Sequence, residues 1–188
     1  MTLRTAVAGL VLAGAACAQG PSENSHPGVN ADSLIISDFQ KRVADYVQLR
    51  KAVESHMPPL KSTASVEKID QHERELGDEM RLARRSAKQG DVFTTQIAGE
   101  FRRLIGFAMH PGGEKIKQSL RHAEPVQLHL KVNDRYPKRV PLQSTPPSLL
   151  QNLPMLPQEI EYRVTGPDLV LLDVKANLIV DLIPGVFS

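Results

Sequence analysis

The stretch EIEYRVTGPDLVLLDVKANLIVDLI, residues Glu159 to Ile183, decides the fold because it divides into three short strands. The segments 159–164, 169–174 and 178–183 are rich in β-branched and aliphatic residues, and turn residues bound each of them. Short loops join the segments, which is typical of antiparallel hairpins. The sequence therefore predicts an antiparallel β-meander here.

The loop between the first two strands decides which side chains share a face, because side chains alternate along a strand. We expect an odd-numbered loop that places Val164 opposite Val170. The second hairpin then pairs Val174 with Leu178. In this register one face is entirely apolar or aromatic and holds Ile160, Tyr162, Val164, Val170, Leu172, Val174, Leu178, Val180 and Leu182.

A register shifted by one residue would place Glu161 and Arg163 on that apolar face. Burying charges without partners is costly, so we favour the first pairing. A lone meander of this size is not stable in water, because burial of its nine apolar side chains does not offset the entropy cost of ordering the segment. It therefore needs a second layer over its apolar face. The first half of the chain is expected to supply that layer.

Apolar residues recur at steps of three and four in the first half, which predicts helices. The first helix runs from about Ser33 to His56, and Met57-Pro58-Pro59 ends it. The second helix is expected to begin at Val66, after an N-cap at Ser65, and to continue to about Gly90.

A third helix, with Asp91 as its N-cap, is expected to extend to about Ala108 and to end before Pro111-Gly112-Gly113. The joints between these helices are short, so consecutive helices should pack antiparallel as an up-down-up bundle. A short fourth helix is expected at Glu114–Ala123, where two apolar residues lie one turn apart.

Apolar and polar residues alternate over Val126–Val132, which predicts a fourth strand. Between it and the meander, prolines limit regular structure to one helical turn at about Ser148–Leu153, so a long crossover is expected. The predicted fold is α+β. A helical region at 33–123, an antiparallel hairpin or three-helix bundle, precedes an antiparallel β region of about four strands at 124–188.

Residues 1–18 read as a signal peptide. One basic residue, Arg4, precedes an uncharged run that is too short to span a bilayer, and small residues precede Gln19. Cys17 permits a second interpretation, in which the thiol is acylated and anchors a lipoprotein. We expect an exported, periplasmic protein under both, and a flexible tether at 19–32 because Gly, Pro, Ser and Asn are frequent there.

The net charge is close to zero, at +2 for the whole chain. Nucleic-acid binding needs a concentrated basic face and stacking aromatics, so no nucleic-acid partner is expected from a nearly neutral chain without Trp. No second long apolar run follows the first, so no transmembrane span is predicted in the mature chain. Removal of Cys17 with the signal peptide would also exclude disulfides and thiol catalysis.

The six histidines form none of the spacings that bring two imidazoles onto one metal ion. His72 and Glu75 are three residues apart on the second helix, which is the spacing of a helical ligand pair. A di-metal carboxylate site needs that pair twice, so a solvated helix face is favoured. We predict no metal site and no cofactor.

Asp173 and Asp181 fall on one face of adjacent strands in the expected register. Two neighbouring carboxyls can act as acid and base in a hydrolase. The alternative is structural, with Asp173 paired to Arg163 and Asp181 keeping a partly exposed face polar. No nucleophile elbow or glycine loop accompanies them, so we favour the structural role and name no catalytic residue.

Basic residues cluster at the end of the second helix and again on the third. Acidic residues precede the first cluster, so a salt-bridged solvent face is expected, although an anionic polymer could bind there. The clusters are Arg81, Arg84, Arg85 and Lys88, and Arg102 and Arg103.

The motifs Glu161-Tyr162-Arg163, Gly166 and Asp173 through Val180, with Tyr136-Pro137 and Pro146-Pro147-Ser148 before them, resemble uncharacterised secreted bacterial proteins. The stretch from Tyr162 to Ile183 is also similar to the C-terminal hairpin of the periplasmic nickel/cobalt-homeostasis regulator family. The likeness covers strand and turn residues only, so no metal-binding residue carries over. It implies export and a small β module.

These observations favour an exported, non-enzymatic envelope protein that binds another envelope protein or a surface polymer. One alternative is a metal-responsive periplasmic protein, implied by the hairpin resemblance and the histidines. The other alternative is a hydrolase that uses Asp173 and Asp181.

Overall fold

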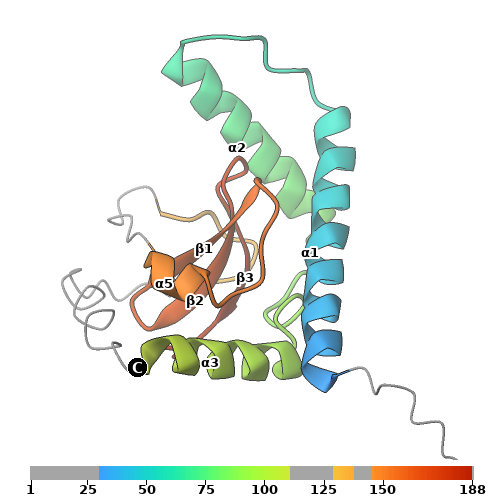
Figure 1. The fold of residues 1–188 in the computed structure, drawn as a ribbon. Coiled ribbons are helices and arrows are strands. Elements are labelled where there is room, and N and C mark those ends of the chain that lie inside the picture. The colour runs from blue at the N-terminus through green and yellow to red at the C-terminus, as the bar shows by residue number, and fades with distance from the viewer. Residues whose placement is uncertain (1–29, 111–128, 138–144, 188) are drawn as a thin grey trace, which may run out of the picture.

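The computed structural model describes residues 30–110, 129–137 and 145–187. The chain has the predicted α+β fold, in which helices precede an antiparallel sheet (Figure 1). Its elements are α1 (Ala31–Ser55), α2 (Val66–Ala83), α3 (Thr95–Met109), α5 (Pro147–Leu150), β1 (Ile160–Thr165), β2 (Asp168–Asp173) and β3 (Leu178–Ile183). The predicted signal peptide with Cys17, residues 19–29 of the tether and the short helix Glu114–Ala123 lie outside the described residues.

Helix α1 confirms the first predicted helix, and its apolar stripe of Phe39, Val43, Tyr46 and Val47 is buried. Helix α2 begins after Ser65, whose side chain accepts a hydrogen bond from the Lys68 N–H, as predicted for an N-cap.

The end of α2 differs from the prediction. The helix ends at Ala83, because Arg84 leaves the helical conformation with φ −112 and ψ 28 and places its side chain in the interior. A tertiary contact thus overrides the local helical pattern up to Gly90. Asp91 does not cap α3. Thr94 does so by accepting from the Ile97 N–H, while Asp91 accepts from the Lys88 N–H at 2.9 Å.

Helices α1 and α3 lie along two different sides of the sheet (Figure 1). Helix α1 stands along one side, and α3 lies across the foot of α1 instead of beside α2. Helix α2 leans away from α1, so the two form a V that opens toward the loop between them. The described part of the chain therefore has a helical hairpin, α1 and α2, with α3 crossing beneath it.

The sheet has the order β1-β2-β3, but the predicted registers of both hairpins are wrong by one residue. In the second hairpin Leu178 pairs with Asp173 and not with Val174. Val164 pairs with Leu169 and Thr165 with Asp168, which leaves a two-residue loop. Gly166 occupies the first loop position with φ 57, a conformation that suits the primed turns of tight hairpins.

This register exchanges the two faces of β2. Leu169 and Leu171 join Tyr162 on the side of the helices, whereas Val170 and Leu172 face the other way. The prediction assumed one buried face. Both faces of β2 and β3 are buried, however, so apolar alternation could not distinguish the two registers.

Segment 129–137 covers the second face, but it does not form the predicted fourth strand. The sheet has three strands, and no strand occurs at 129–132, the described part of Val126–Val132. The chain turns at Asn133, with φ 70, and only then runs along the edge of β3. There the Tyr136 N–H donates to the Asn177 carbonyl at 3.0 Å, and Arg135 forms a single β-bridge with Leu178.

An aromatic cluster joins α1, α3 and the helix side of the sheet. The Phe39 ring centroid lies 4.8 Å from that of Phe101 and 5.6 Å from that of Phe93. Phe101 in turn lies 5.9 Å from Tyr162 of β1. These rings are buried, so they fix α3 beneath the sheet by apolar contact. The predicted helical turn after the prolines is confirmed as α5.

Candidate functional site

The described residues contain two features with functional potential, a buried polar cluster beneath the sheet and an open groove between α1 and α2. The polar cluster begins with a bulge in β3. Leu171 pairs with Asp181 and Leu172 pairs with Ile179, so Val180 is an extra residue on β3. Because of this residue, both Val180 and Asp181 face the helices.

Asp181 is fully buried and organises the loop before α3. Its Oδ2 accepts hydrogen bonds from the N–H groups of Val92 and Phe93, both at 2.8 Å. The Gly90 N–H donates to the same carboxylate at 3.1 Å, and the Leu182 N–H donates at 2.8 Å. One buried carboxylate therefore satisfies several backbone donors that a loop would otherwise leave without acceptors.

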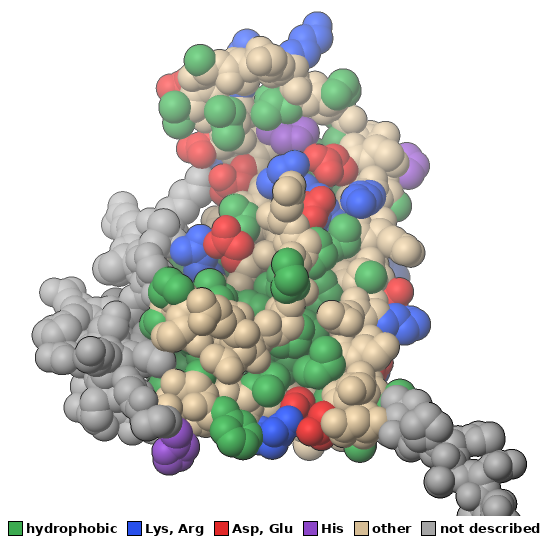
Figure 2. All heavy atoms as spheres, in the orientation of Figure 1, with side chains coloured by type: hydrophobic (Ala, Val, Ile, Leu, Met, Phe, Trp, Pro, Cys, Tyr) green, Lys and Arg blue, Asp and Glu red, His purple; other side chains and the backbone are tan. Residues whose placement is uncertain are grey.

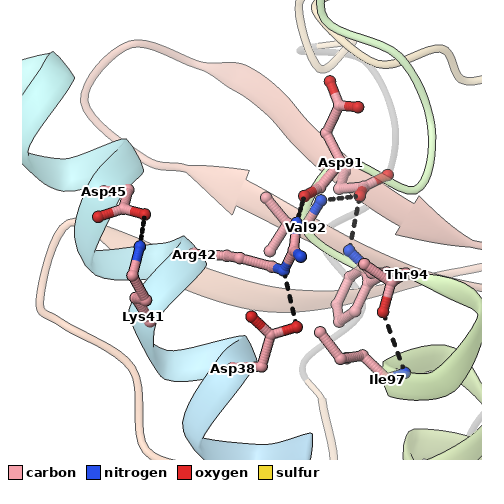
Figure 3. A network of polar contacts seen from close by, with 10 residues as sticks. Asp38, Lys41, Arg42, Asp45, Asp91, Val92, Thr94 and Ile97 are labelled. Atoms are coloured by element: carbon pink, nitrogen blue, oxygen red, sulfur yellow. Dashed lines mark hydrogen bonds and ion pairs between the residues drawn. The ribbon is translucent and has the colours of Figure 1, made fainter.

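The same loop is also held from α1 (Figure 3). Arg42 donates to the Asp91 carbonyl at 2.9 Å, and its Nε donates to Asp38 at 2.9 Å. The loop lies between the carboxylate of β3 and the guanidinium of α1. It thereby links the sheet, α1 and the start of α3.

Asp173 at the end of β2 is also fully buried, and it contacts α1. Tyr46 donates its hydroxyl to Oδ2 at 2.8 Å, and the Arg50 Nε lies 3.1 Å from the same atom. The Lys175 and Ala176 N–H groups donate to Oδ1 at 3.1 and 3.0 Å. Burial raises the pKa of Asp173, and these contacts oppose that rise.

Burial also changes the pKa values of Tyr46 and Arg84. Burial, and next the neighbouring Asp173 carboxylate, raise the pKa of the Tyr46 hydroxyl far above its ordinary value. The Arg84 guanidinium lies 4.9 Å from the Tyr46 ring centroid and donates to the Val180 carbonyl at 3.0 Å. Burial lowers the pKa of Arg84, although it remains a cation at neutral pH.

Arg84 therefore does not belong to the predicted solvent-exposed basic patch, whereas Arg81, Arg85 and Lys88 are exposed. Arg81 pairs with Asp78 across one turn at 3.8 Å, as expected of a salt-bridged helix face. In the second basic group, Arg103 pairs with Glu100 and Asp32, and Arg102 donates to the Pro184 carbonyl.

Asp173 and Asp181, the pair of the alternative hydrolase hypothesis, do lie on one side of the sheet. The bulge in β3 places them there, not the expected register. The predicted pairing of Asp173 with Arg163 is wrong. Arg50 is its partner, and Arg163 pairs with Glu161 at 2.6 Å. Each carboxylate has its own set of donors and neither is exposed, so a substrate could reach them only if the helices separated.

Sequence reasoning missed Arg50, which is 1% exposed and lies 3.3 Å from Glu54. Its place in the sequence could have indicated that it is buried. It follows Phe39, Val43, Tyr46 and Val47 at helical spacing, so it lies on the apolar stripe of α1. A basic residue on such a stripe needs a buried counter-ion, which Asp173 provides.

The histidines do not assemble in the described residues, where no group of three His, Cys, Asp or Glu side chains could hold a metal ion. His72 is half-buried, and Glu75 is exposed and accepts a hydrogen bond from Gln71 at 2.8 Å. The His56 Nδ1 is bonded to the Ala52 carbonyl at 2.6 Å. His26 and His122 lie outside the described residues.

The second feature is a groove of about 570 Å³ in the V between the end of α1 and the second half of α2, and we call it the wedge. Its volume is within the range of about 300–1,000 Å³ that is common for binding sites. Apolar side chains from both helices line it, with carboxylates on the α2 side. The lining residues are Val53, His56, Met57, Pro58, Glu75, Glu79, Leu82 and Ala83.

Apolar side chains remain uncovered around the wedge and along α2. Leu82 is 67% exposed, Val66 is 65% exposed and Ile69 is 44% exposed. Figure 2 shows hydrophobic and acidic side chains side by side at the top of the molecule, over α2 and the loop before it. A surface of this composition is typical of protein contacts.

No helix in the described parts of the chain is long and apolar enough to cross a membrane. No family model, no curated protein and no solved structure matches the chain. The resemblance noted in the meander therefore stays a prediction.

Proposed function

We propose that this chain is an exported, non-enzymatic protein of the bacterial envelope that acts by binding another envelope component. The observation that carries the proposal is the apolar seam of α2. Its second half, with Leu76 and Met80, is buried against the body, whereas Val66 and Ile69 continue the same seam without cover from the described residues. An apolar helix stripe exposed to water is stabilised by a partner.

The polar cluster supports a binding role because its charged groups serve the fold. Asp181 holds the loop before α3, and Asp173 holds α1 through Arg50 and Tyr46. A catalytic carboxyl must touch its substrate, but these side chains are enclosed by the elements that they join. Helix α2 and the wedge, by contrast, present accessible apolar and acidic side chains.

Export is tested by the N-terminus of the mature protein. Expression in a bacterium, cell fractionation and mass spectrometry should give a periplasmic protein that begins at Gln19, or a lipid-modified one that begins at Cys17. An intact Met1 on a cytoplasmic protein would contradict the proposed location.

Binding is tested by affinity capture with the full chain from envelope extract, in parallel at low and high salt. We expect the same specific partner in both, in smaller amount at high salt, because apolar contact tolerates salt while ion pairs are screened. An extract that gives no specific partner at any salt concentration would count against the proposal. Capture by a variant with Val66→Asp and Ile69→Asp should fail, since both side chains are exposed and their replacement spares the core.

A further inference from the structure

The wedge has an apolar floor that continues the core of the protein. Val53 and Met57 are half-buried at the end of α1 and pack against the main core. Leu82 faces them from α2 and is 67% exposed. Val53 and Met57 on one side and Leu82 on the other form an apolar groove, and such a groove accommodates the apolar stripe of a third helix.

The charge on the α2 side of the wedge is negative. Glu75 and Glu79 both line the groove. The arginines of α2 do not neutralise it, because Arg74 and Arg81 line other grooves on either side of the helix. An occupant of the wedge therefore meets carboxylates beside an apolar floor.

The two carboxylates are one helical turn apart, and like charges at this spacing repel each other. Glu75 accepts a hydrogen bond from Gln71, but the Glu79 side chain has no hydrogen bond or ion pair within the described residues. The chain thus keeps a like-charged pair beside an uncovered leucine. A cationic group placed between the carboxylates would relieve the repulsion.

We propose that the wedge docks a cationic amphipathic helix of a partner protein. The apolar stripe of that helix lies on Val53, Met57 and Leu82, and its Lys or Arg side chains pair with Glu75 and Glu79. This inference rests on the proposed binding function and names the chemistry of the partner. The other uncovered residues of α2, Val66 and Ile69, do not line the wedge and lie on a different face of the helix.

The test uses the full chain and a fluorescein-labelled model helix of Leu and Lys, about 14 residues or four turns long. A second helix with Glu in place of every Lys is the control ligand. Fluorescence anisotropy should show saturable binding of the Lys helix that weakens as salt is added, and no binding of the Glu helix. Equal binding of both helices would overturn the proposal, because it would show that charge plays no part.

The variants Glu79→Gln and Leu82→Ser separate the two halves of the contact. Each should weaken binding of the Lys helix about tenfold. Both positions are exposed, so the fold should persist, and circular dichroism verifies this. Asp45→Asn is the matched control, because it removes one exposed carboxylate of α1 that does not line the wedge. Unchanged binding by Glu79→Gln and Leu82→Ser would overturn the inference.

Repeating the capture from envelope extract with the same variants distinguishes this inference from the proposed function. A partner that is captured by wild type and equally by Glu79→Gln and Leu82→Ser would leave the binding function intact and refute the wedge as its site. Failure of wild type to capture any partner would count against the proposed function itself. If wild type still bound the Lys helix and the two variants did not, the wedge would remain supported as a groove for a cationic helix.

Discussion

Asp181→Ala is the substitution that most directly tests how the fold is held together. Asp181 is 0% exposed, and its carboxylate accepts hydrogen bonds from the loop before α3. In the variant the N–H groups of Val92 and Phe93 lose their acceptor while both residues remain buried. Each buried donor without an acceptor costs about 1–3 kcal/mol, so we expect a loss of about 2–6 kcal/mol.

Urea unfolding followed by circular dichroism measures this loss as a change in the free energy of unfolding. Because a domain of this size is stable by only about 5–15 kcal/mol, Asp181→Asn serves as the milder variant. Its amide keeps one acceptor oxygen but places an NH2 group next to backbone N–H donors. We therefore expect the free energy of unfolding to fall by about 1–3 kcal/mol. Hydrogen exchange at the Val92 and Phe93 amides should accelerate.

Asp45→Asn is the control, since its ion pair with Lys41 is exposed at both ends and is worth about 0–1 kcal/mol. If Asp181→Ala were as stable as Asp45→Asn, the buried carboxylate would not be organising the loop. The bulge in β3, which turns Asp181 toward the helices, would then have no part in holding that loop.

Two further predictions concern α2 and Asp173. A Cβ on Gly77 would lie 2.7 Å from the Ala176 carbonyl oxygen, so Gly77→Ala should lower the free energy of unfolding by about 1–3 kcal/mol despite the better helix propensity of alanine. Gly99 has open space around it, so Gly99→Ala should instead raise the free energy of unfolding by up to about 1 kcal/mol. An equal increase for Gly77→Ala would contradict the close packing at Gly77. Burial raises the pKa of Asp173, so its stabilising contribution is fully present below the unfolded pKa of about 3.9 and is lost as the pH rises through the folded pKa. Urea titrations should therefore show the advantage of wild type over Asp173→Asn shrinking from about pH 3.5 to pH 7, whereas a growing advantage would mean that the Arg50 pair outweighs burial.

The helices were predictable where tertiary contacts agree with local pattern. The periodic apolar residues of α1 and the Ser65 N-cap of α2 marked helices that the structure confirms. The end of α2 was not predictable in this way. Arg84 belongs to a helix-compatible run, and only its contacts with Tyr46 and the Val180 carbonyl take it out of the helix.

The sheet shows a second limit of local reasoning. Alternation identifies a register only when one face meets water, and here segment 129–137 covers the second face with Tyr136 and Leu130. The sequence also could not indicate the bulge at Val180, which decides where Asp181 points. A better signal was available in α1, because Arg50 interrupts an apolar stripe and so predicts a buried carboxylate opposite it.

The contacts that fix α2 also explain why the wedge can be a preformed groove. Asn133 donates to the Arg81 and Arg84 carbonyls, and Arg135 donates to the Arg74 carbonyl, so segment 133–135 holds α2 from Arg74 to its C-terminal end. The start of α2 lies at the open end of the V, away from α1 (Figure 1). Because α2 is fixed at the narrow end of the V, Leu82 stays apart from Val53 and Met57 without a ligand. Docking then costs little rearrangement, which is the condition under which a small groove gives useful affinity.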